Sequence, residues 1–141
     1  MNTRASMKYL VVNSVALMVH TKDNPSDDEW SDFMTRLRQD RGKYGCALIF
    51  TDGGGPSTMQ RGQMNDAFEE MGFKGKVAVV TISRLARGIV TALSWFNPNV
   101  KAFTPLQINA ALEYLEVPAK DQDKVRGELT RVRTQLGLPV T

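Results

Sequence analysis

The sequence predicts an α/β domain built on a mixed, mostly parallel sheet. Short apolar runs rich in β-branched residues alternate with amphipathic helical patterns, and four of the five helical patterns open with an N-capping residue. The first two apolar runs are separated only by the turn-forming pair Asn13-Ser14. Alternating strands and helices are typical of parallel crossovers, whereas a two-residue turn makes an antiparallel hairpin. The predicted order is β-β-α-β-α-β-α-β-α-α.

The first predicted elements are a hairpin and a helix. The hairpin strands are predicted at residues 9–12 and 15–19. The first helix opens after Pro25, where Ser26 and Glu29 have the spacing of a capping box. Its predicted buried face consists of four apolar residues, Trp30, Phe33, Met34 and Leu37. Gly42 suits the end of this helix.

Two strand–helix units follow. The strand at residues 46–50 leads through a glycine-rich loop to Ser57, which forms a second capping box with Gln60. The apolar face of this helix comprises Met64, Ala67, Phe68 and Met71, and Gly72 suits its C-terminal cap. The strand at residues 77–80 leads to a helix capped by Ser83. Its predicted buried stripe is Leu85, Ile89, Leu93 and Phe96, before a stop at Asn97-Pro98.

The last part of the chain adds a strand and two helices. The strand at residues 100–103 precedes a helix opened by a capping box of Thr104 and Gln107, with Pro105 at the first helical position. Its stripe is Ile108, Ala111, Leu112 and Leu115. The final helix, 119–136, has an apolar seam of Val125, Leu129, Val132 and Leu136. That seam either docks onto the domain, which is the more economical arrangement, or pairs with a second copy. Its mixed polar face, which includes Lys124, Arg126, Arg131 and Arg133, indicates a solvated surface.

Composition narrows the class of protein. With 141 residues, 42% hydrophobic and 23% charged, the chain fits one domain, 1–141, with a core at 8–116. A formal net charge of +3 is too small to indicate nucleic-acid binding. The N-terminus lacks a signal-peptide pattern, and no apolar run reaches the roughly 20 residues of a membrane helix. The lone Cys46 suits a reducing compartment, so we expect a cytoplasmic protein. One histidine and one cysteine exclude the usual zinc sets, and we expect no metal or cofactor.

The loop from Thr51 to Arg61 carries the most functional information. It comprises Asp52, Gly53, Gly54, Gly55, Pro56, Ser57 and Thr58 before the helix proper. Loops at the carboxyl ends of parallel strands are where open α/β sheets bind ligands. Consecutive glycines let a ligand approach the backbone, the helix N-terminus suits an anion, and Arg61 adds a charge one turn later. Alternatively, the glycines merely permit a tight connection. The loop has neither the P-loop nor the dinucleotide-binding pattern.

A second segment, residues 83–88, occupies the equivalent place after the next strand. Arg84 and Arg87 are three apart and share a helix face. We expect both loops at one sheet edge, where Asp52 can meet either arginine; the alternative is an ordinary surface salt bridge. Trp95 falls one residue off the apolar stripe. It either serves as a half-exposed binding anchor or folds over the sheet edge.

The leading hairpin followed by alternating helices and strands, from Lys8 to Glu116, resembles the STAS fold of anti-sigma-factor antagonists. It is also similar to a sporulation-antagonist-like family that borders on CRAL-TRIO lipid-binding domains. The resemblance implies a bacterial-type regulatory domain that binds a protein, a nucleotide or a lipid without doing chemistry. It also implies a phosphorylated hydroxyl after the third strand, in a pattern like Asp-Ser-Ser/Thr-Gly. Asp52 matches the aspartate, whereas Ser57 and Thr58 lie four residues downstream of the pattern's hydroxyls.

Three functions are compatible with these residues. The first, which we favour because no nucleophile–base pair is recognisable, is an interaction module that binds a protein at residues 52–61 and 83–87, with Trp95 nearby. The second is a binder of a small anion, a nucleotide or a lipid head group, through Arg61, Arg84 and Arg87. The third is an enzyme using His20 and Asp52. The simpler interpretation is that His20 is a satisfied polar residue at a strand end, with its hydrogen bonds made within the chain. Cys46 is interpreted as a buried side chain that packs in the core.

Overall fold

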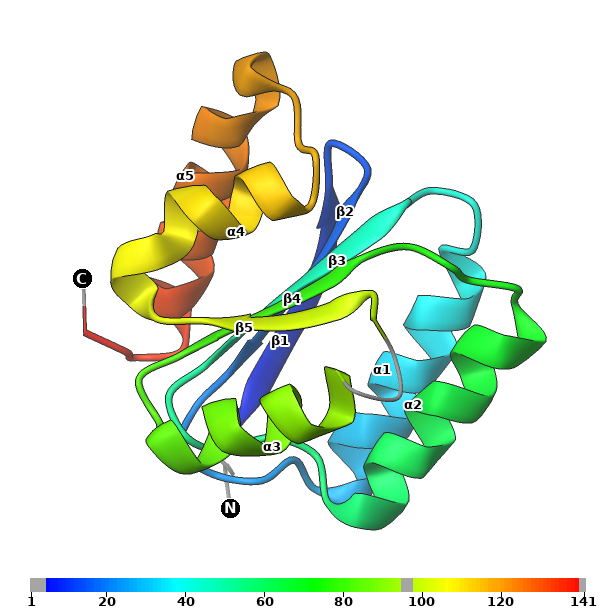
Figure 1. Cartoon of the computed structure of the whole chain (residues 1–141). Coiled ribbons are helices and arrows are strands. Elements are labelled where there is room, and N and C mark those ends of the chain that lie inside the picture. The colour runs from blue at the N-terminus through cyan, green and yellow to red at the C-terminus, as the bar shows by residue number, and fades with distance from the viewer. Residues whose placement is uncertain (1–4, 95–97, 140–141) are drawn as a thin grey trace.

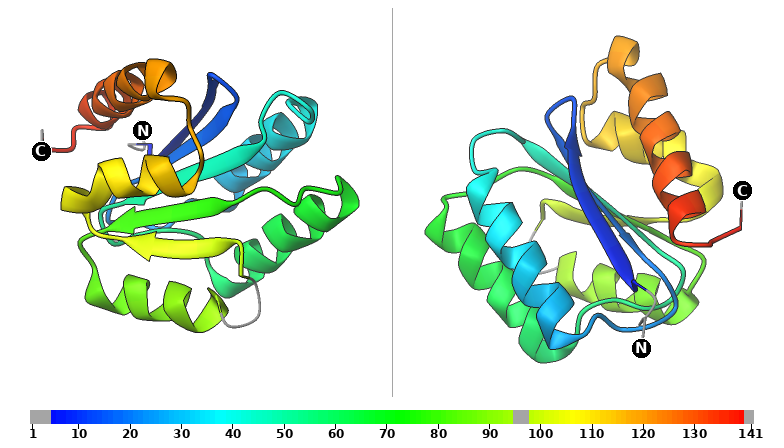
Figure 2. Two further views of the ribbon diagram at one scale, coloured as in Figure 1. Left: turned by 45° about the horizontal axis from the view of Figure 1, so that its top comes forward. Right: turned by 180° about the vertical axis from the view of Figure 1, so that it is seen from behind.

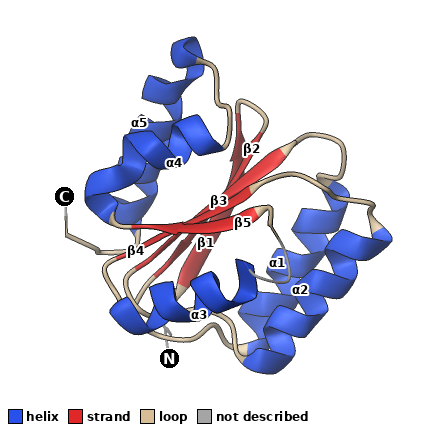
Figure 3. Cartoon of the chain, in the orientation of Figure 1, coloured by secondary structure: helices blue, strands red, loops and turns tan. Residues whose placement is uncertain are grey.

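One five-stranded sheet organises the chain, whose computed structural model describes residues 5–94 and 98–139. The strands lie in sequence order and are β1 (Met7–Val12), β2 (Val15–His20), β3 (Cys46–Thr51), β4 (Val77–Thr81) and β5 (Val100–Phe103). β1 is antiparallel to β2, and all other neighbours are parallel. The predicted α/β class with a mixed, mostly parallel sheet is therefore confirmed (Figure 3).

The helices cover both faces of the sheet. They are α1 (Asp27–Gln39), α2 (Thr58–Glu70), α3 (Arg84–Ser94), the 3-10 turn η1 (Pro105–Gln107), α4 (Ile108–Tyr114) and α5 (Ala119–Gln135). α1, α2 and α3 lie on one face, and α4 and α5 on the other (Figures 1 and 2). The first three crossovers step along the sheet in one direction, and crossovers of one hand then place their helices on one face. Within the described residues no helix is long and apolar enough to cross a membrane.

The hairpin follows from its two-residue turn. Asn13 and Ser14 both have positive φ, 46° and 67°, as both central residues of a type I′ turn require. The register pairs Val12 with Val15 directly beside the turn and Met7 with His20 at the other end. The turn therefore fixes which side chains of β2 face each layer of helices.

Strand alternation divides the core into two clusters. Val19 of β2 and Phe50 of β3 pack on the face covered by α4 and α5. Met18 and Ala47 point to the opposite side of their strands and pack on the face covered by α1 and α2. Successive side chains of a strand point to opposite faces, so neighbouring residues at a strand end belong to different layers.

The last helix closes one of these clusters. Its seam of Val125, Leu129, Val132 and Leu136 is buried together with residues of the sheet. Docking within the chain, the more economical of the two predicted arrangements, is therefore what the structure shows.

The third and fourth helices differ from prediction. Leu85 and Ile89 are 77% and 40% exposed, so the predicted burial of the α3 stripe is wrong for both. α3 contacts β4 and β5 and leaves these two side chains uncovered. The side chain of Leu93 and residues 95–97, including the candidate anchor Trp95, lie outside what the structure describes. The fourth helix begins with a 3-10 turn that leaves Leu106 98% exposed.

Candidate functional site

The β3–α2 and β4–α3 connections leave the sheet side by side. His20, Thr51 and Thr81 end three parallel neighbouring strands, and the register aligns each with the next. The two predicted segments, residues 52–61 and 83–87, therefore lie at one edge, which we call the loop edge.

The glycine loop packs against the chain's own backbone. The N–H of Gly54 donates to the Thr21 carbonyl at 2.9 Å. A Cβ added to Gly54 would overlap the backbone of Thr21, Lys22 and Asp23, which belong to the β2–α1 loop. The close approach predicted for this loop is therefore to the chain's own backbone. Glycine is required at position 54 because the neighbouring β2–α1 loop leaves no space for a side chain.

Several N–H groups of this loop already have partners. The N–H of Asp52 donates to the His20 carbonyl at 3.2 Å, and that of Gly53 to Thr51 Oγ1 at 3.1 Å. The N–H of Ser57 donates to Gln60 Oε1 at 2.9 Å. A phosphate-binding loop presents free N–H groups to its ligand. These bonds therefore weaken the case for an anion cradle.

The second capping box fixes the start of α2. The Gln60 N–H donates to Ser57 Oγ at 3.2 Å, the reciprocal bond to the one above. The buried Gln60 side chain also donates through Nε2 to the Pro25 carbonyl at 3.2 Å, which joins α2 to the loop before α1. Ser57 and Thr58 are exposed. The cap is as predicted, and it holds the end of the glycine loop that leads into α2.

Asp52 pairs with a residue of the last helix. Arg133 Nη1 lies 2.7 Å from Asp52 Oδ1, and Arg133 Nη2 donates to the Pro139 carbonyl at 3.0 Å. The guanidinium lies 4.6 Å from the centroid of the Phe50 ring, and Arg133 is only 4% exposed. The predicted contact of Asp52 with Arg84 or Arg87 is therefore wrong.

The physical reason is the alternation of β3. Phe50 packs on the α5 face, and Asp52, two residues later, turns its carboxylate to the same side, away from α3. The prediction that Arg133 belongs to the solvated face of the last helix is wrong as well. One signal was available: Arg133 lies four residues after Leu129 and three before Leu136, so it shares their side of the helix.

The three candidate arginines have different environments. Arg87 donates through Nη1 to the Thr81 carbonyl at 2.8 Å and so braces its own helix start. Arg84 is exposed. Arg61 donates to Thr58 Oγ1 at 3.2 Å and, alone of the three, lines a pocket between α2 and α3.

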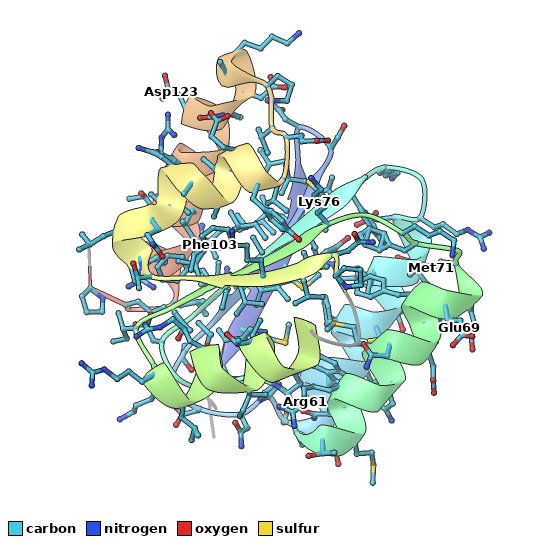
Figure 4. The ribbon with its side chains drawn as sticks, viewed as in Figure 1. Arg61, Glu69, Met71, Lys76, Phe103 and Asp123 are labelled. Carbon is cyan, nitrogen blue, oxygen red and sulfur yellow. The ribbon has the colours of Figure 1, made fainter. Side chains whose placement is uncertain are left out.

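This pocket, the α2–α3 groove, has a volume of about 260 Å³. Its walls are the glycine loop, α2 and α3, and its lining residues are Asn24, Thr51, Gly53, Gly54, Gly55, Pro56, Arg61, Val79, Ser83, Leu85, Ala86, Ile89 and Val90. Arg61 is the only charged residue among them. Figure 4 labels Arg61, in the region where α2 and α3 approach each other. The exposed Leu85 and Ile89 thus border an apolar hollow with one cation.

His20 and Asp52 do not form an acid–base pair. By the alternation of β2, His20 faces the α1 layer, whereas the Asp52 carboxylate faces α5. His20 is 2% exposed, and among the residues that the structure describes its Nδ1 finds no hydrogen-bond partner, so the prediction of a satisfied histidine is wrong for this atom. Burial lowers the pKa of His20 to about 4, although the charge of Glu29 opposes the shift. A base this weak and this enclosed is neutral at pH 7.

Cys46 lies at the start of β3 and is half-buried against the core. Burial raises the pKa of its thiol to about 11, which keeps it protonated and unreactive at neutral pH. Among residues 5–94 and 98–139, no group of three or more histidine, cysteine, aspartate or glutamate side chains is placed to hold a metal ion. Comparisons of the chain with protein-family models, with curated proteins and with solved structures found no match.

Proposed function

We propose that this chain is a non-catalytic interaction module whose loop edge binds a protein partner. The observation that carries the proposal is the pair of exposed side chains, Leu85 and Ile89, beside the apolar α2–α3 groove. Single exposed aliphatic residues are common, but contiguous apolar surface around a hollow marks an interaction site. The glycine loop lines the same groove, and the backbone bond of Gly54 and the Ser57 cap fix the position of this loop.

The same proposal includes the regulatory role that the STAS-like resemblance implies. The antiparallel hairpin and the alternating strands and helices are compatible with that family. The exposed hydroxyls of Ser57 and Thr58 lie at the start of α2, where the family's members carry a phosphorylated group. A phosphate at that position would add negative charge to the rim of the groove and change which partner binds.

A small anionic ligand, a nucleotide or a lipid head group, is the second candidate, and Arg61 is the observation in its favour. Two observations favour the protein partner over it. The N–H groups of Asp52, Gly53, Gly54 and Ser57 are engaged within the chain. The groove is also lined mainly by uncharged residues, with no second charge to complement a phosphate.

Site-specific photo-crosslinking tests the proposal. A photoreactive amino acid is placed at Ile89 in one variant and at Leu106 in another, because both positions are exposed and apolar but only Ile89 lines the groove. We expect a discrete crosslinked protein from position 89 alone. That protein is then purified and its affinity for the uncrosslinked chain is measured. Equal crosslinking from both positions, or substrate turnover that Asp52→Ala abolishes, would contradict the proposal.

A further inference from the structure

We infer that the α2–α3 groove receives an amphipathic helix with an acidic flank, supplied by a protein partner. The inference rests on the proposed function and adds the chemistry of the partner's binding segment. It is carried by the shape of the apolar surface, by the cations in and beside the groove and by the acidic residues farther along the same edge.

The apolar surface has helical spacing. Leu85 and Ile89 are four residues apart on α3 and form a ridge along one wall, while Val79 and Val90 also line the groove. One wall is the helix α3, and the opposite side is formed by the glycine loop and by Arg61 of α2. A helix packs on another by inserting ridges of side chains into the grooves of its neighbour. A partner helix with apolar residues at i, i+3, i+4 and i+7 can cover this ridge and place one anchor in the hollow.

The cations in and beside the groove favour carboxylates on the partner segment. Arg61 on α2 is the only charged lining residue, and in the described part of the chain it forms no ion pair; its hydrogen bond goes to Thr58 of its own helix. Arg84 does not line the groove, but it is exposed at the first turn of α3, directly before the lining residue Leu85. A partner helix with glutamates or aspartates beside its apolar stripe would meet Arg61 in the groove and Arg84 beside it.

The balance of charge in the β2–α1 segment favours a protein over an anionic membrane, because three exposed aspartates outnumber the one exposed lysine, Lys22. Asp23, Asp27 and Asp28 follow β2 at the same carboxyl edge, and all three are exposed. A flat anionic bilayer that reached Arg61 would also meet these carboxylates and be repelled. The hollow shape of the groove likewise suits an inserted side chain better than a planar surface.

Two designed peptides test the inference directly. They share one apolar helical face, but one has glutamate and the other lysine at every flanking position. Fluorescence anisotropy measures the binding of each to the full chain at low and high salt. We expect the glutamate peptide to bind more tightly than the lysine peptide by at least about tenfold, with a preference that shrinks at high salt.

Variants locate the binding. Leu85→Glu and Arg61→Gln are each expected to weaken the glutamate peptide by about tenfold, whereas Leu106→Glu, an equally apolar position outside the groove, leaves it unchanged. Thermal unfolding of each variant verifies that it is folded. If Leu85→Glu does not fold, the affinity of Arg61→Gln for the glutamate peptide alone tests the inference.

Three outcomes would overturn the inference: equal binding of the two peptides, no binding of either, or binding that Arg61→Gln and Leu85→Glu do not affect. Stronger binding to phosphatidylserine vesicles than to the glutamate peptide would show that this surface binds a membrane and not a helix. Dimerisation that Leu85→Glu abolishes would show that the occupant is a second copy of the chain. A protein that crosslinks at Ile89 but binds through a segment without acidic residues would leave the proposed function intact and refute only this inference.

Discussion

Asp52 and Arg133, 81 positions apart in the chain, form an ion pair of 2.7 Å that joins the glycine loop to the last turns of α5. Arg133 also holds the chain end through the Pro139 carbonyl and covers the ring of Phe50. The loop edge therefore has an internal support on the α5 face of the sheet, while the α2–α3 groove lies on the α3 face. This separation gives Asp52 a structural role, and we propose a binding role for Arg61 alone.

The ion pair is expected to contribute substantially to stability. Replacing Arg133 by methionine leaves the partly buried Asp52 carboxylate without its partner, and breaking such a pair costs about 3 kcal/mol. Urea unfolding measures this loss. Arg131→Met is the matched control, because Arg131 is exposed on the same helix, and we expect it to unfold close to the wild type. Equal stability of the two variants would show that the Asp52–Arg133 pair contributes nothing.

Two glycine substitutions distinguish backbone packing from helix propensity. Gly54→Ala forces a methyl group into the carbonyls of Thr21 and Asp23, so we expect a destabilisation of more than about 2 kcal/mol. Gly62→Ala, inside α2 with open space around it, is expected to raise stability by up to about 1 kcal/mol. Thermal unfolding of both variants tests the pair. A neutral Gly54→Ala would mean that the loop can move away from its neighbour.

His20 makes stability dependent on pH. Its pKa is about 4 in the folded chain and about 6.5 when exposed, so the unfolded state binds more protons between these values. Stability present above pH 6.5 is therefore lost as the pH falls towards 4, by on the order of 3 kcal/mol.

His20→Gln removes this contribution while leaving all the carboxylates in place. We expect its stability to change less than that of the wild type between pH 6.5 and 4.5. Since His20 is the only histidine, its imidazole NMR signal reports the folded pKa directly. A titration midpoint near 6.5 would contradict the burial described here.

The helix cap at Ser57 has a measurable energy. Ser57→Ala removes the acceptor for the Gln60 N–H, and we expect a loss of about 1 kcal/mol in the free energy of unfolding. Ser57→Asp keeps an acceptor and adds a negative charge at the helix N-terminus, so it is expected to retain most of that stability. If the alanine variant melts at the wild-type temperature, the cap does not stabilise α2.

Local rules predicted much of the fold. The turn at Asn13-Ser14 and the capping boxes of Ser26 and Ser57 depend on residues within four positions of one another, and the structure contains all three. The partner of Asp52 depends on how the last helix docks, a contact between distant segments that no local pattern specifies. The only sign of this contact in the sequence was that Arg133 has the spacing of the apolar seam of the last helix.

The burial of Leu85 and Ile89 in the α3 stripe was predicted wrongly for a related reason. Apolar spacing predicts that a helix has one face to cover, but it does not say whether the covering surface belongs to the same chain. Leu85 and Ile89 follow the helical period and yet remain exposed. This exposed apolar pair is the observation on which the proposed binding at the α2–α3 groove rests.

We propose above that the loop edge binds a protein through this groove. The most direct measurement is the affinity of the purified partner, recovered by crosslinking at Ile89, for the wild type, Leu85→Glu and Leu106→Glu by isothermal titration calorimetry. We expect that Leu85→Glu weakens binding by at least about tenfold and that Leu106→Glu binds like the wild type. Equal affinity of all three proteins, each verified as folded, would contradict it.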